Sequence, residues 1–325
     1  MDMTDSKGKS RILIIGATGH IGRHVAKASV VLGHPTFTLV RRTQQSPNPA
    51  REELIQSFKS MGITVIYGSL QDEESSLVEI IKKVDVVIST VNALSLAEQF
   101  NLLNAIKTAG NIKRFFPSEF GNDCDKAHPV EPVKTFMERK AKPRRMIESE
   151  GIPYTYVSSF AFAAYYIPNC FKKGYFIPDK GGNQGLPPLP PDTMLVPGDG
   201  KAKAVFVMEE DIATYTIKAV DDPRTLNKTL HLRPPANIVS YNELIGLWEK
   251  QTGKTLQKIY IPEQQYLQKI AEAPFPGNIG LAFGHTILLK GDQTNFEIGG
   301  QDLEGCQLYP EVAYTKLIDF VTKVK

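Results

Sequence analysis

The feature that most limits what this chain can fold into is the regular alternation of strand-like and helix-like segments over its first half. Short apolar runs predict strands buried on both faces of a sheet, and stretches with helical periodicity separate them. The expected strands cover residues 11–15, 36–40, 63–67, 84–90, 112–116 and 154–159, and the expected helices cover residues 20–32, 50–61, 73–83, 93–109 and 132–148. Repeated strand–helix units predict a doubly wound α/β fold, with a mostly parallel sheet and helices on both faces.

The second half of the chain breaks this rhythm. Residues 181–197 are rich in Gly and Pro, which predicts a loop that is either a lid or binding loop or a passive linker. Three further helices, with short strands between them, are expected over residues 209–220, 241–252 and 263–271. We therefore expect a sheet domain over residues 1–159 and a smaller α/β region over residues 160–325, from which some segments return to the sheet.

Composition argues against several classes of protein. The formal net charge is +3, which is too small to indicate binding to nucleic acid or to an anionic membrane. No apolar run approaches the roughly 20 residues that cross a bilayer, and residues 1–10 lack the apolar segment of a secretory signal. Cys124, Cys170 and Cys306 lie too far apart for metal-ligand spacing and do not suggest a disulfide framework. We expect a cytoplasmic protein without a metal site, either a monomer or a homodimer.

A glycine motif stands between the first expected strand and the first expected helix. Its sequence is Gly-Ala-Thr-Gly-His-Ile-Gly. Such a turn needs backbone angles that side chains forbid, and bare backbone lets a pyrophosphate approach the helix N-terminus, where N–H groups and the helix dipole favour an anion. The third glycine lets helix and strand pack closely. The alternative is a tight structural turn in an α/β protein that binds something other than a dinucleotide. In this context the motif predicts a Rossmann-type dinucleotide site made by Gly16, Thr18, Gly19, His20, Ile21 and Gly22.

The end of the second expected strand indicates which dinucleotide is bound. An Asp or Glu there would hold the ribose 2′-hydroxyl of NAD, but this chain has Arg41 and Arg42, about 20 residues beyond the glycines. A carboxylate would repel a 2′-phosphate, whereas a guanidinium binds it with two parallel hydrogen bonds. The sequence therefore predicts NADPH as the cofactor. For Arg42, the alternative to phosphate binding is a place on a solvated face of the protein.

Catalytic residues are harder to find from the pattern alone. Short-chain dehydrogenases pair a tyrosine with a lysine four residues later, and none of the 12 tyrosines of this chain has a lysine at that offset. Lys140 is another candidate, because a lysine on a helix beside the nicotinamide can transfer protons. The basic stretch 139–145 that contains it is more typical of a solvated helix face, and we expect its other members to be solvated.

Five segments resemble the plant isoflavone reductase group, which is an atypical, NmrA-like branch of the short-chain dehydrogenases. They are residues 16–22, 85–91, 115–122 (Phe-Phe-Pro-Ser-Glu-Phe-Gly-Asn), 151–157 (Gly-Ile-Pro-Tyr-Thr-Tyr-Val) and 222–229. The group includes phenylcoumaran benzylic ether reductases, pinoresinol–lariciresinol reductases and eugenol synthases. The resemblance runs from about residue 9 to the end of the chain.

The resemblance implies an NADPH-dependent oxidoreductase of plant phenylpropanoid metabolism, in which Lys140 exchanges a proton with a phenolic substrate. Ionising a phenol para to a benzylic carbon helps expel the benzylic oxygen as a quinone methide forms, and hydride then adds to that carbon. Residues 130–132 and 158–159 favour benzylic ether reduction of a phenylcoumaran-type lignan over isoflavone reduction. The resemblance also implies a nicotinamide wall of Thr90, Val91, Ser118, Glu119 and Phe120, and a substrate pocket lined by Phe160, Phe162, Tyr166 and the region of His285.

Three positions depart from the family pattern. Phe160 stands where the family usually has Asn, Asn92 stands where glycine is frequent, and Pro143 lies inside the expected lysine helix, where proline removes a backbone donor and can cause a kink. Two alternatives therefore stay open. One is reduction of an isoflavone, an imine or another conjugated electrophile, and the other is a non-catalytic sensor of NADP(H).

Overall fold

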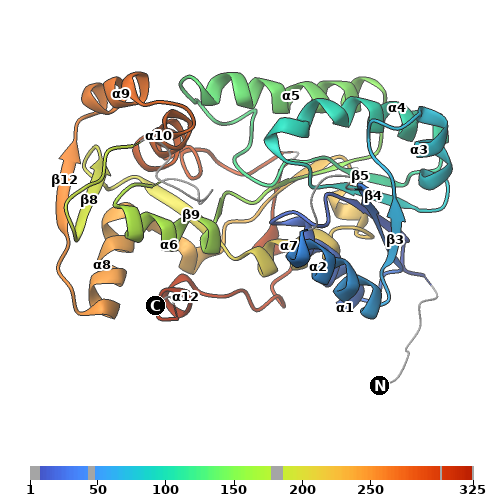
Figure 1. Ribbon diagram of the computed structural model, residues 1–325, viewed down its shortest axis with the longest axis horizontal. Coiled ribbons are helices and arrows are strands. Elements are labelled where there is room, and N and C mark those ends of the chain that lie inside the picture. The colour runs from blue at the N-terminus through green and yellow to red at the C-terminus, as the bar shows by residue number, and fades with distance from the viewer. Residues whose placement is uncertain (1–7, 43–47, 177–185, 301, 324–325) are drawn as a thin grey trace.

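The computed structural model describes residues 8–42, 48–176, 186–300 and 302–323. Its centre is a parallel sheet of five strands in the order β3-β2-β1-β4-β5, which confirms the expected fold class (Figure 1). The strands are β1 (Ile12–Ile15), β2 (Thr36–Val40), β3 (Thr64–Tyr67), β4 (Val86–Ser89) and β5 (Arg114–Phe116). The helices that alternate with them are α1 (Gly22–Val31), α2 (Pro49–Ser60), α3 (Glu74–Ile81), the 3₁₀-helix η1 (Ala93–Glu98), α4 (Gln99–Ala109) and α5 (Val133–Ser149).

Helices cover the sheet on both faces, and β1 shows why its sequence is apolar throughout. Ile12 and Ile14 face a core shared with α1 and with α7 (Glu209–Lys218). Leu13 and Ile15 face a second core shared with α3, α4 and α5. Because successive side chains of a strand point to opposite faces, a strand buried on both faces must be apolar at every position.

Strands from the second half of the chain extend the sheet beyond β5. A parallel bridge joins Phe115 to Tyr154, next to β6 (Thr155–Ser158). β6 pairs in parallel with β10 (Lys228–His231), which pairs in parallel with β13 (Asp302–Glu304). The sheet of the first half is thus continued by strands that lie about 70 and 150 residues further along the chain than β6.

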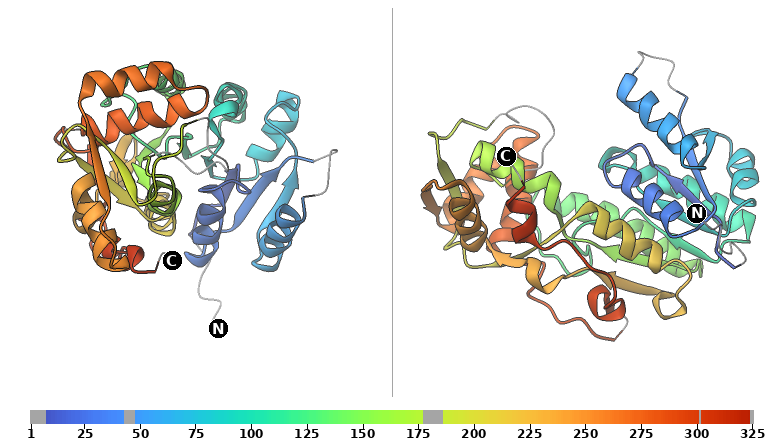
Figure 2. Two further views of the ribbon diagram at one scale, coloured as in Figure 1. Left: turned by 60° about the vertical axis from the view of Figure 1, so that its left-hand side comes forward. Right: turned by 90° about the horizontal axis from the view of Figure 1, so that it is seen from below.

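Most of the remaining elements form the smaller region seen at the left of Figure 1, and Figure 2 shows this region on the side away from α1 and α2 in both further views. Its strands are β7 (Ala161–Phe162), β9 (Lys203–Val207) and β11 (Ile238–Ser240) in one sheet, and β8 (Thr193–Pro197) with β12 (Gln257–Ile261) in another. Its helices are α6 (Ala163–Lys173), η3 (Pro235–Asn237), α8 (Tyr241–Thr252), α9 (Glu263–Glu272), α10 (Gly277–Gly284), the π-helix η4 (His285–Leu289) and α12 (Leu317–Val321). Two further short helices, η2 (Pro223–Thr225) and α11 (Gly305–Leu308), lie instead beside β10 and β13.

One predicted loop is partly wrong. Of the Gly- and Pro-rich stretch 181–197, residues 181–185 lie outside the described residues, and residues 186–192 carry no helix or strand. Its last five residues form β8, which is buried along its whole length and pairs with β12. The prolines directly before this short apolar run indicate a loop, and for this reason the strand is not predicted from the sequence.

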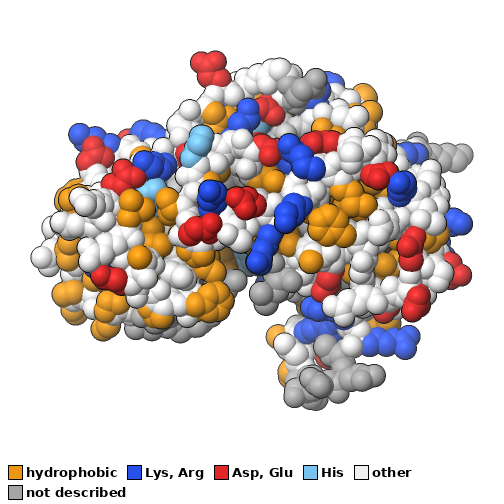
Figure 3. Space-filling model, turned by 90° about the horizontal axis from the view of Figure 1, so that it is seen from above, with side chains coloured by type: hydrophobic (Ala, Val, Ile, Leu, Met, Phe, Trp, Pro, Cys, Tyr) orange, Lys and Arg blue, Asp and Glu red, His pale blue; other side chains and the backbone are white. Residues whose placement is uncertain are grey.

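In the part of the chain that the structure describes, the face of the molecule that carries α5 shows no concentration of one charge (Figure 3). Figure 3 shows Lys and Arg side chains interspersed with Asp and Glu over that face. Among the described residues, no helix is both long enough and apolar enough to cross a membrane.

Candidate active site

The glycine turn after β1 is built around close backbone contacts. Gly16 has a φ of +80°, and a Cβ placed there would lie 2.6 Å from the carbonyl oxygen of Thr90. A Cβ at Gly22 would lie 2.2 Å from the carbonyl oxygen of Gly16. Gly19 N–H donates to Gly16 O at 2.8 Å. The first helix therefore starts against the end of β1 and against β4, as a dinucleotide-binding turn requires.

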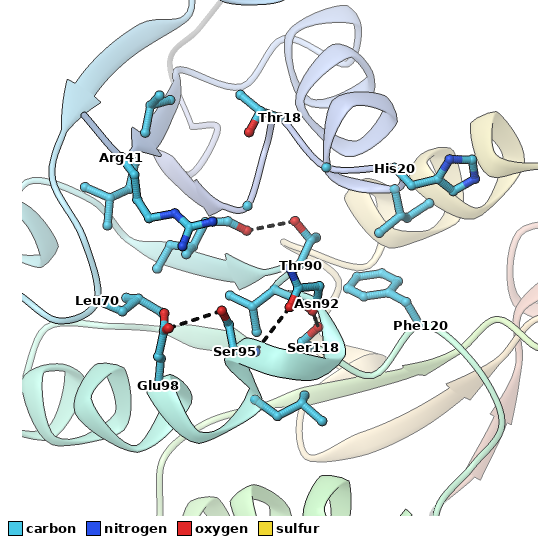
Figure 4. Close-up of a pocket in the computed structure, with 18 of the residues that line it drawn as sticks. Thr18, His20, Arg41, Leu70, Thr90, Asn92, Ser95, Glu98, Ser118 and Phe120 are labelled. Carbon is cyan, nitrogen blue, oxygen red and sulfur yellow. Dashed lines mark hydrogen bonds between the residues drawn. The ribbon is translucent and has the colours of Figure 1, made fainter. Parts of the chain in front are cut away.

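A cleft of about 630 Å³ opens at the carboxyl ends of the central strands. It lies where the strand order reverses between β1 and β4, which is the usual ligand-binding point of such sheets. Figure 4 shows Arg41 and Leu70 on one side of this cleft and His20 and Phe120 on the other. Of the predicted site residues, the cleft lining includes Gly16, Thr18, Gly19, His20, Ile21, Arg41, Arg42, Thr90, Val91, Ser118, Glu119, Phe120, Lys140 and Phe162. Gly22 lies behind the turn.

One wing of the cleft is basic. Arg41 and Arg42 follow β2 and are exposed. Arg51, in the first turn of α2, also lines this wing and donates from Nη2 to the carbonyl oxygen of Arg41 at 2.6 Å. The three guanidinium groups, two after β2 and one on α2, form a region suited to a phosphate. Arg51 was not among the residues predicted from the sequence, although its place at the start of the helix after this strand was a usable signal.

Lys140 lies at the other end of the cleft. Its side chain comes from α5, is 7 % exposed, and donates from Nζ to the carbonyl oxygen of Glu119. The ring of Phe136, one helical turn earlier, lies 5.9 Å from Nζ. α5 continues through Pro143 as one helix to Ser149. The proline therefore does not remove Lys140 from the cleft.

The expectation that the other basic residues of 139–145 are solvated is wrong for Arg144, which is 1 % exposed. Its guanidinium forms ion pairs with Glu119 and Asp123, both at 2.7 Å, and lies 4.5 Å from the ring centroid of Tyr156. Burial opposes the charge, but the carboxylates of Glu119 and Asp123 leave the pKa of Arg144 raised. Neighbouring Arg145 is exposed, as expected.

An aromatic group borders the cleft beside the glycine turn. The ring of His20 lies 5.7 Å from that of Phe162 and 4.8 Å from that of Tyr165, centroid to centroid. Its Nε2 forms a hydrogen bond with Glu209 Oε1 at 2.7 Å, and that carboxylate is buried at the start of α7. With Phe120 and Phe136, these rings give the Lys140 end of the cleft flat apolar surfaces that suit an aromatic ligand.

A family model described as the NmrA-like family matches residues 8–321. The chain belongs to the NmrA-like family. It is 60 % identical over 316 residues to a phenylcoumaran benzylic ether reductase of Ginkgo biloba, with 97 % of this chain and 99 % of that protein covered. It is 54 % identical over 315 residues to a eugenol synthase of Petunia hybrida, covering 97 % of this chain and 98 % of that protein. The resemblance to the isoflavone reductase group is thereby confirmed.

Solved structures agree with this NmrA-like assignment. An isoflavone reductase superposes with a TM-score of 0.88 at 42 % identity, covering 97 % of this chain and 99 % of that one. A leucoanthocyanidin reductase of Vitis vinifera, solved as a binary complex with NADPH, superposes with a TM-score of 0.85 at 37 % identity, with the same coverage.

Three residues expected in the substrate pocket of this NmrA-like protein lie outside the cleft. Phe160 is 3 % exposed, and its ring stacks 6.0 Å from that of His231. Tyr166 stacks on Phe176 at 4.8 Å and packs against a core cluster of the smaller region. His285 is 1 % exposed and forms a hydrogen bond from Nε2 to Glu263 at 3.0 Å. Among the four predicted substrate contacts, Phe162 alone lines the cleft.

The cleft also contains polar and aromatic residues that the sequence analysis did not single out as site residues. They lie on the loops after β3 and β4 and on the helices that face them. Ser95 donates to Glu98 at 3.1 Å, and Asn92 caps the same short helix through the Ser95 N–H at 3.2 Å. A side chain at position 92, where the family often has glycine, is thus part of the cleft wall. The additional lining residues include Arg51, Leu70, Asn92, Ser95, Glu98, Phe136 and Tyr165.

Proposed function

We propose that this NmrA-like protein is an NADPH-dependent reductase of phenylpropanoid-derived substrates, acting by benzylic ether reduction of a phenylcoumaran-type lignan. The observation that carries the proposal is that one cleft joins the glycine turn, a basic wing and a buried lysine surrounded by aromatic rings. Each of these features suits one part of the reaction.

The residues present fit NADPH. The glycine turn leaves room for a pyrophosphate where a Cβ at Gly16 or Gly19 would crowd the backbone. Arg41, with Arg42 and Arg51 beside it, would hold the 2′-phosphate in the basic wing. The Thr90–Val91 and Ser118–Phe120 segments would line the nicotinamide. When bound, NADPH supplies a hydride from C4 of its nicotinamide.

Lys140 would move the proton. Its amine lies at the edge of the cleft next to the Phe136 ring, where a substrate phenol can reach it. By accepting the proton of a phenol para to the benzylic carbon, Lys140 would help break the benzylic C–O bond. The oxygen that leaves is protonated in turn, and Lys140 can return the proton that it accepted. The flanking rings would hold the aromatic substrate in place.

The substrate class follows from the relatives. The Ginkgo protein, at 60 % identity over nearly the whole chain, is named for phenylcoumaran benzylic ether reduction, and the sequence features at residues 130–132 and 158–159 support the same class. The Petunia eugenol synthase, at 54 %, makes a phenylpropanoid ester the main competing substrate.

The test is NADPH oxidation, followed at 340 nm, with a phenylcoumaran, a pinoresinol, a 2′-hydroxyisoflavone and a coniferyl ester. We expect turnover of the phenylcoumaran and loss of it, by roughly 1,000-fold, in Lys140→Ala, since a general acid–base group commonly contributes 10²–10⁴-fold. Lys142→Ala, an exposed lysine on the same helix, is the matched control and should keep full activity. Full activity of Lys140→Ala would overturn the catalytic assignment. If the parent protein oxidises no NADPH with any of the four compounds but still binds NADPH, the result would favour a cofactor-binding sensor.

A further inference from the structure

The amine of Lys140 is held by one short segment of backbone. Its Nζ donates to the carbonyl oxygen of Glu119, in the segment 117–121 that follows β5. This segment therefore decides where the amine lies relative to the cleft, and whatever fixes the segment also fixes the lysine.

The segment has a backbone conformation that needs support. Phe120, directly after Glu119, has a φ of +34° although it is not glycine. Residues with side chains hold such angles only where their surroundings enforce them. Ser118 is fixed on one side, because its N–H donates to Gln99 Oε1 at 2.8 Å and its hydroxyl donates to Val91 O at 2.7 Å.

Arg144 fixes Glu119 itself. Its Nε donates to Glu119 Oε1 at 3.1 Å and its Nη2 donates to Oε2 at 2.7 Å, so the guanidinium and the carboxylate meet through two parallel hydrogen bonds. Such a fork sets the orientation of the carboxylate as well as its distance. Both side chains are almost completely buried, with 2 % and 3 % of their area exposed.

The position of Arg144 on its helix completes a closed arrangement. It follows Lys140 by four residues on α5, and residues at this spacing lie on the same helix face. One helix face thus holds Glu119 twice, through its carboxylate by Arg144 and through its carbonyl by Lys140. Arg144 does not line the cleft.

We propose that Arg144 is a positioning residue for Lys140, which acts by clamping Glu119 so that its carbonyl oxygen holds the lysine amine at the cleft. This inference rests on the proposed function in that Lys140 is taken as the proton-transfer group. Arg144 itself touches neither the cofactor-binding turn nor the cleft.

Asp123 provides a matched comparison. Its carboxylate is as buried as that of Glu119 and pairs with the same guanidinium at 2.7 Å, through Nη1. The structure gives it no contact with Lys140. A purely structural role for the buried ion pairs predicts equal damage from Glu119→Gln and Asp123→Asn, whereas a positioning role predicts that only the first reaches Lys140.

The first experiment measures the reactivity of the Lys140 amine, without any substrate. Parent, Arg144→Lys, Glu119→Gln, Asp123→Asn and Arg145→Lys proteins are pulsed with acetic anhydride, and acetylation of Lys140 is quantified by mass spectrometry against exposed Lys142. We expect labelling of Lys140 to rise roughly threefold or more in Arg144→Lys and Glu119→Gln, because the amine loses its fixed acceptor. Asp123→Asn and Arg145→Lys should match the parent. Melting temperatures identify any variant that fails to fold, and Glu119→Gln tests the same link if Arg144→Lys is lost.

The second experiment separates turnover from binding. With the phenylcoumaran, Arg144→Lys should lower kcat by roughly 100-fold, since a displacement of about 1 Å can cost this much, while the Kd for NADPH changes by less than about threefold. Equal labelling and equal kcat in Glu119→Gln and Asp123→Asn would overturn the positioning role. If Lys140→Ala stays active while labelling still responds to Arg144→Lys, the proposed catalytic role of Lys140 fails and the Arg144–Glu119–Lys140 linkage stands. If Lys140→Ala is inactive and labelling does not respond, the linkage alone fails.

Discussion

Replacing Gly22 by alanine tests whether the glycine turn is built as described. A Cβ at this position would lie 2.2 Å from the Gly16 carbonyl oxygen and 2.6 Å from Thr90 Oγ1. Neither neighbour can easily withdraw. The first is backbone, and the Thr90 hydroxyl donates to the carbonyl of Ile15 at 2.7 Å. Relieving the overlap with Gly16 means moving the start of α1 by about 1 Å from β1, because an ordinary carbon–oxygen contact exceeds 3 Å.

Overpacking of a well-packed site costs about 1–3 kcal/mol, and the backbone contact places Gly22→Ala at or above the top of that range. We expect urea unfolding to show a loss of about 3 kcal/mol or more. The Kd for NADPH should rise by at least about tenfold, since the helix N-terminus leaves its place beside the pyrophosphate. Binding can be followed by quenching of protein fluorescence.

Gly246→Ala is the control for this substitution. Gly246 lies within α8, and a Cβ there would meet no atom within 4 Å. Alanine should stabilise that helix by about 1 kcal/mol and leave NADPH binding unchanged. A Gly22→Ala protein within 0.5 kcal/mol of the parent, with unaltered affinity for NADPH, would refute the packing argument, because the measured cost would lie about sixfold below the estimate.

Three further substitutions test other parts of the molecule. Arg41→Ala should weaken NADPH binding by about 2–3 kcal/mol, roughly 100-fold, and NADH binding much less. The Kd of each nucleotide can be measured by titrating the protein with it, and equal losses would mean that Arg41 does not hold the 2′-phosphate. Burial raises the pKa of Asp211 from 3.8 to about 6, so its contribution to stability is present at low pH and is lost as pH rises through about 6. Asp211→Asn, which keeps an acceptor for the Thr315 N–H at 2.8 Å, should therefore gain about 2 kcal/mol relative to the parent between pH 4 and pH 7.5, and a pH-independent difference would contradict this. Arg114→Met removes donors to Ala219 O, Asp222 O and Thr225 Oγ1. We expect urea unfolding to show a loss of about 3 kcal/mol with the Kd for NADPH unchanged, and a loss below about 1 kcal/mol would mean that these three hydrogen bonds contribute little to stability.

The sheet of the first half could be predicted from the sequence because its information is local. A strand buried on both faces is apolar at every position, as in β1, and glycines mark where several helices stop. The position of Lys140 at the cleft also agrees with the sequence analysis, although the resemblance to a family, rather than the pattern, pointed to it. Its catalytic role stays a prediction.

The environment of Arg144 could not be predicted, because it depends on partners distant in sequence. Two consecutive arginines on a helix look alike, and only the folded chain brings Glu119 and Asp123 against the first of them. The same holds for β8, whose partner β12 lies more than 60 residues later. Phe160 faces His231 for a similar reason, since the strand that carries His231 comes from the second half of the chain.

The return of β10 and β13 to the side of β6 has a consequence for how the chain is made. During synthesis β6 emerges first, with one edge free, and its hydrogen-bonding partner is about 70 residues away. β13 ends at Glu304, so the ribosome must add more than 140 residues after β6 before the sheet is complete. Until then the nascent protein presents an open strand edge, which is a template for association with other chains. A truncated product ending at residue 159 would keep that edge permanently, and we would expect it to be recovered in inclusion bodies rather than as a folded nucleotide-binding fragment.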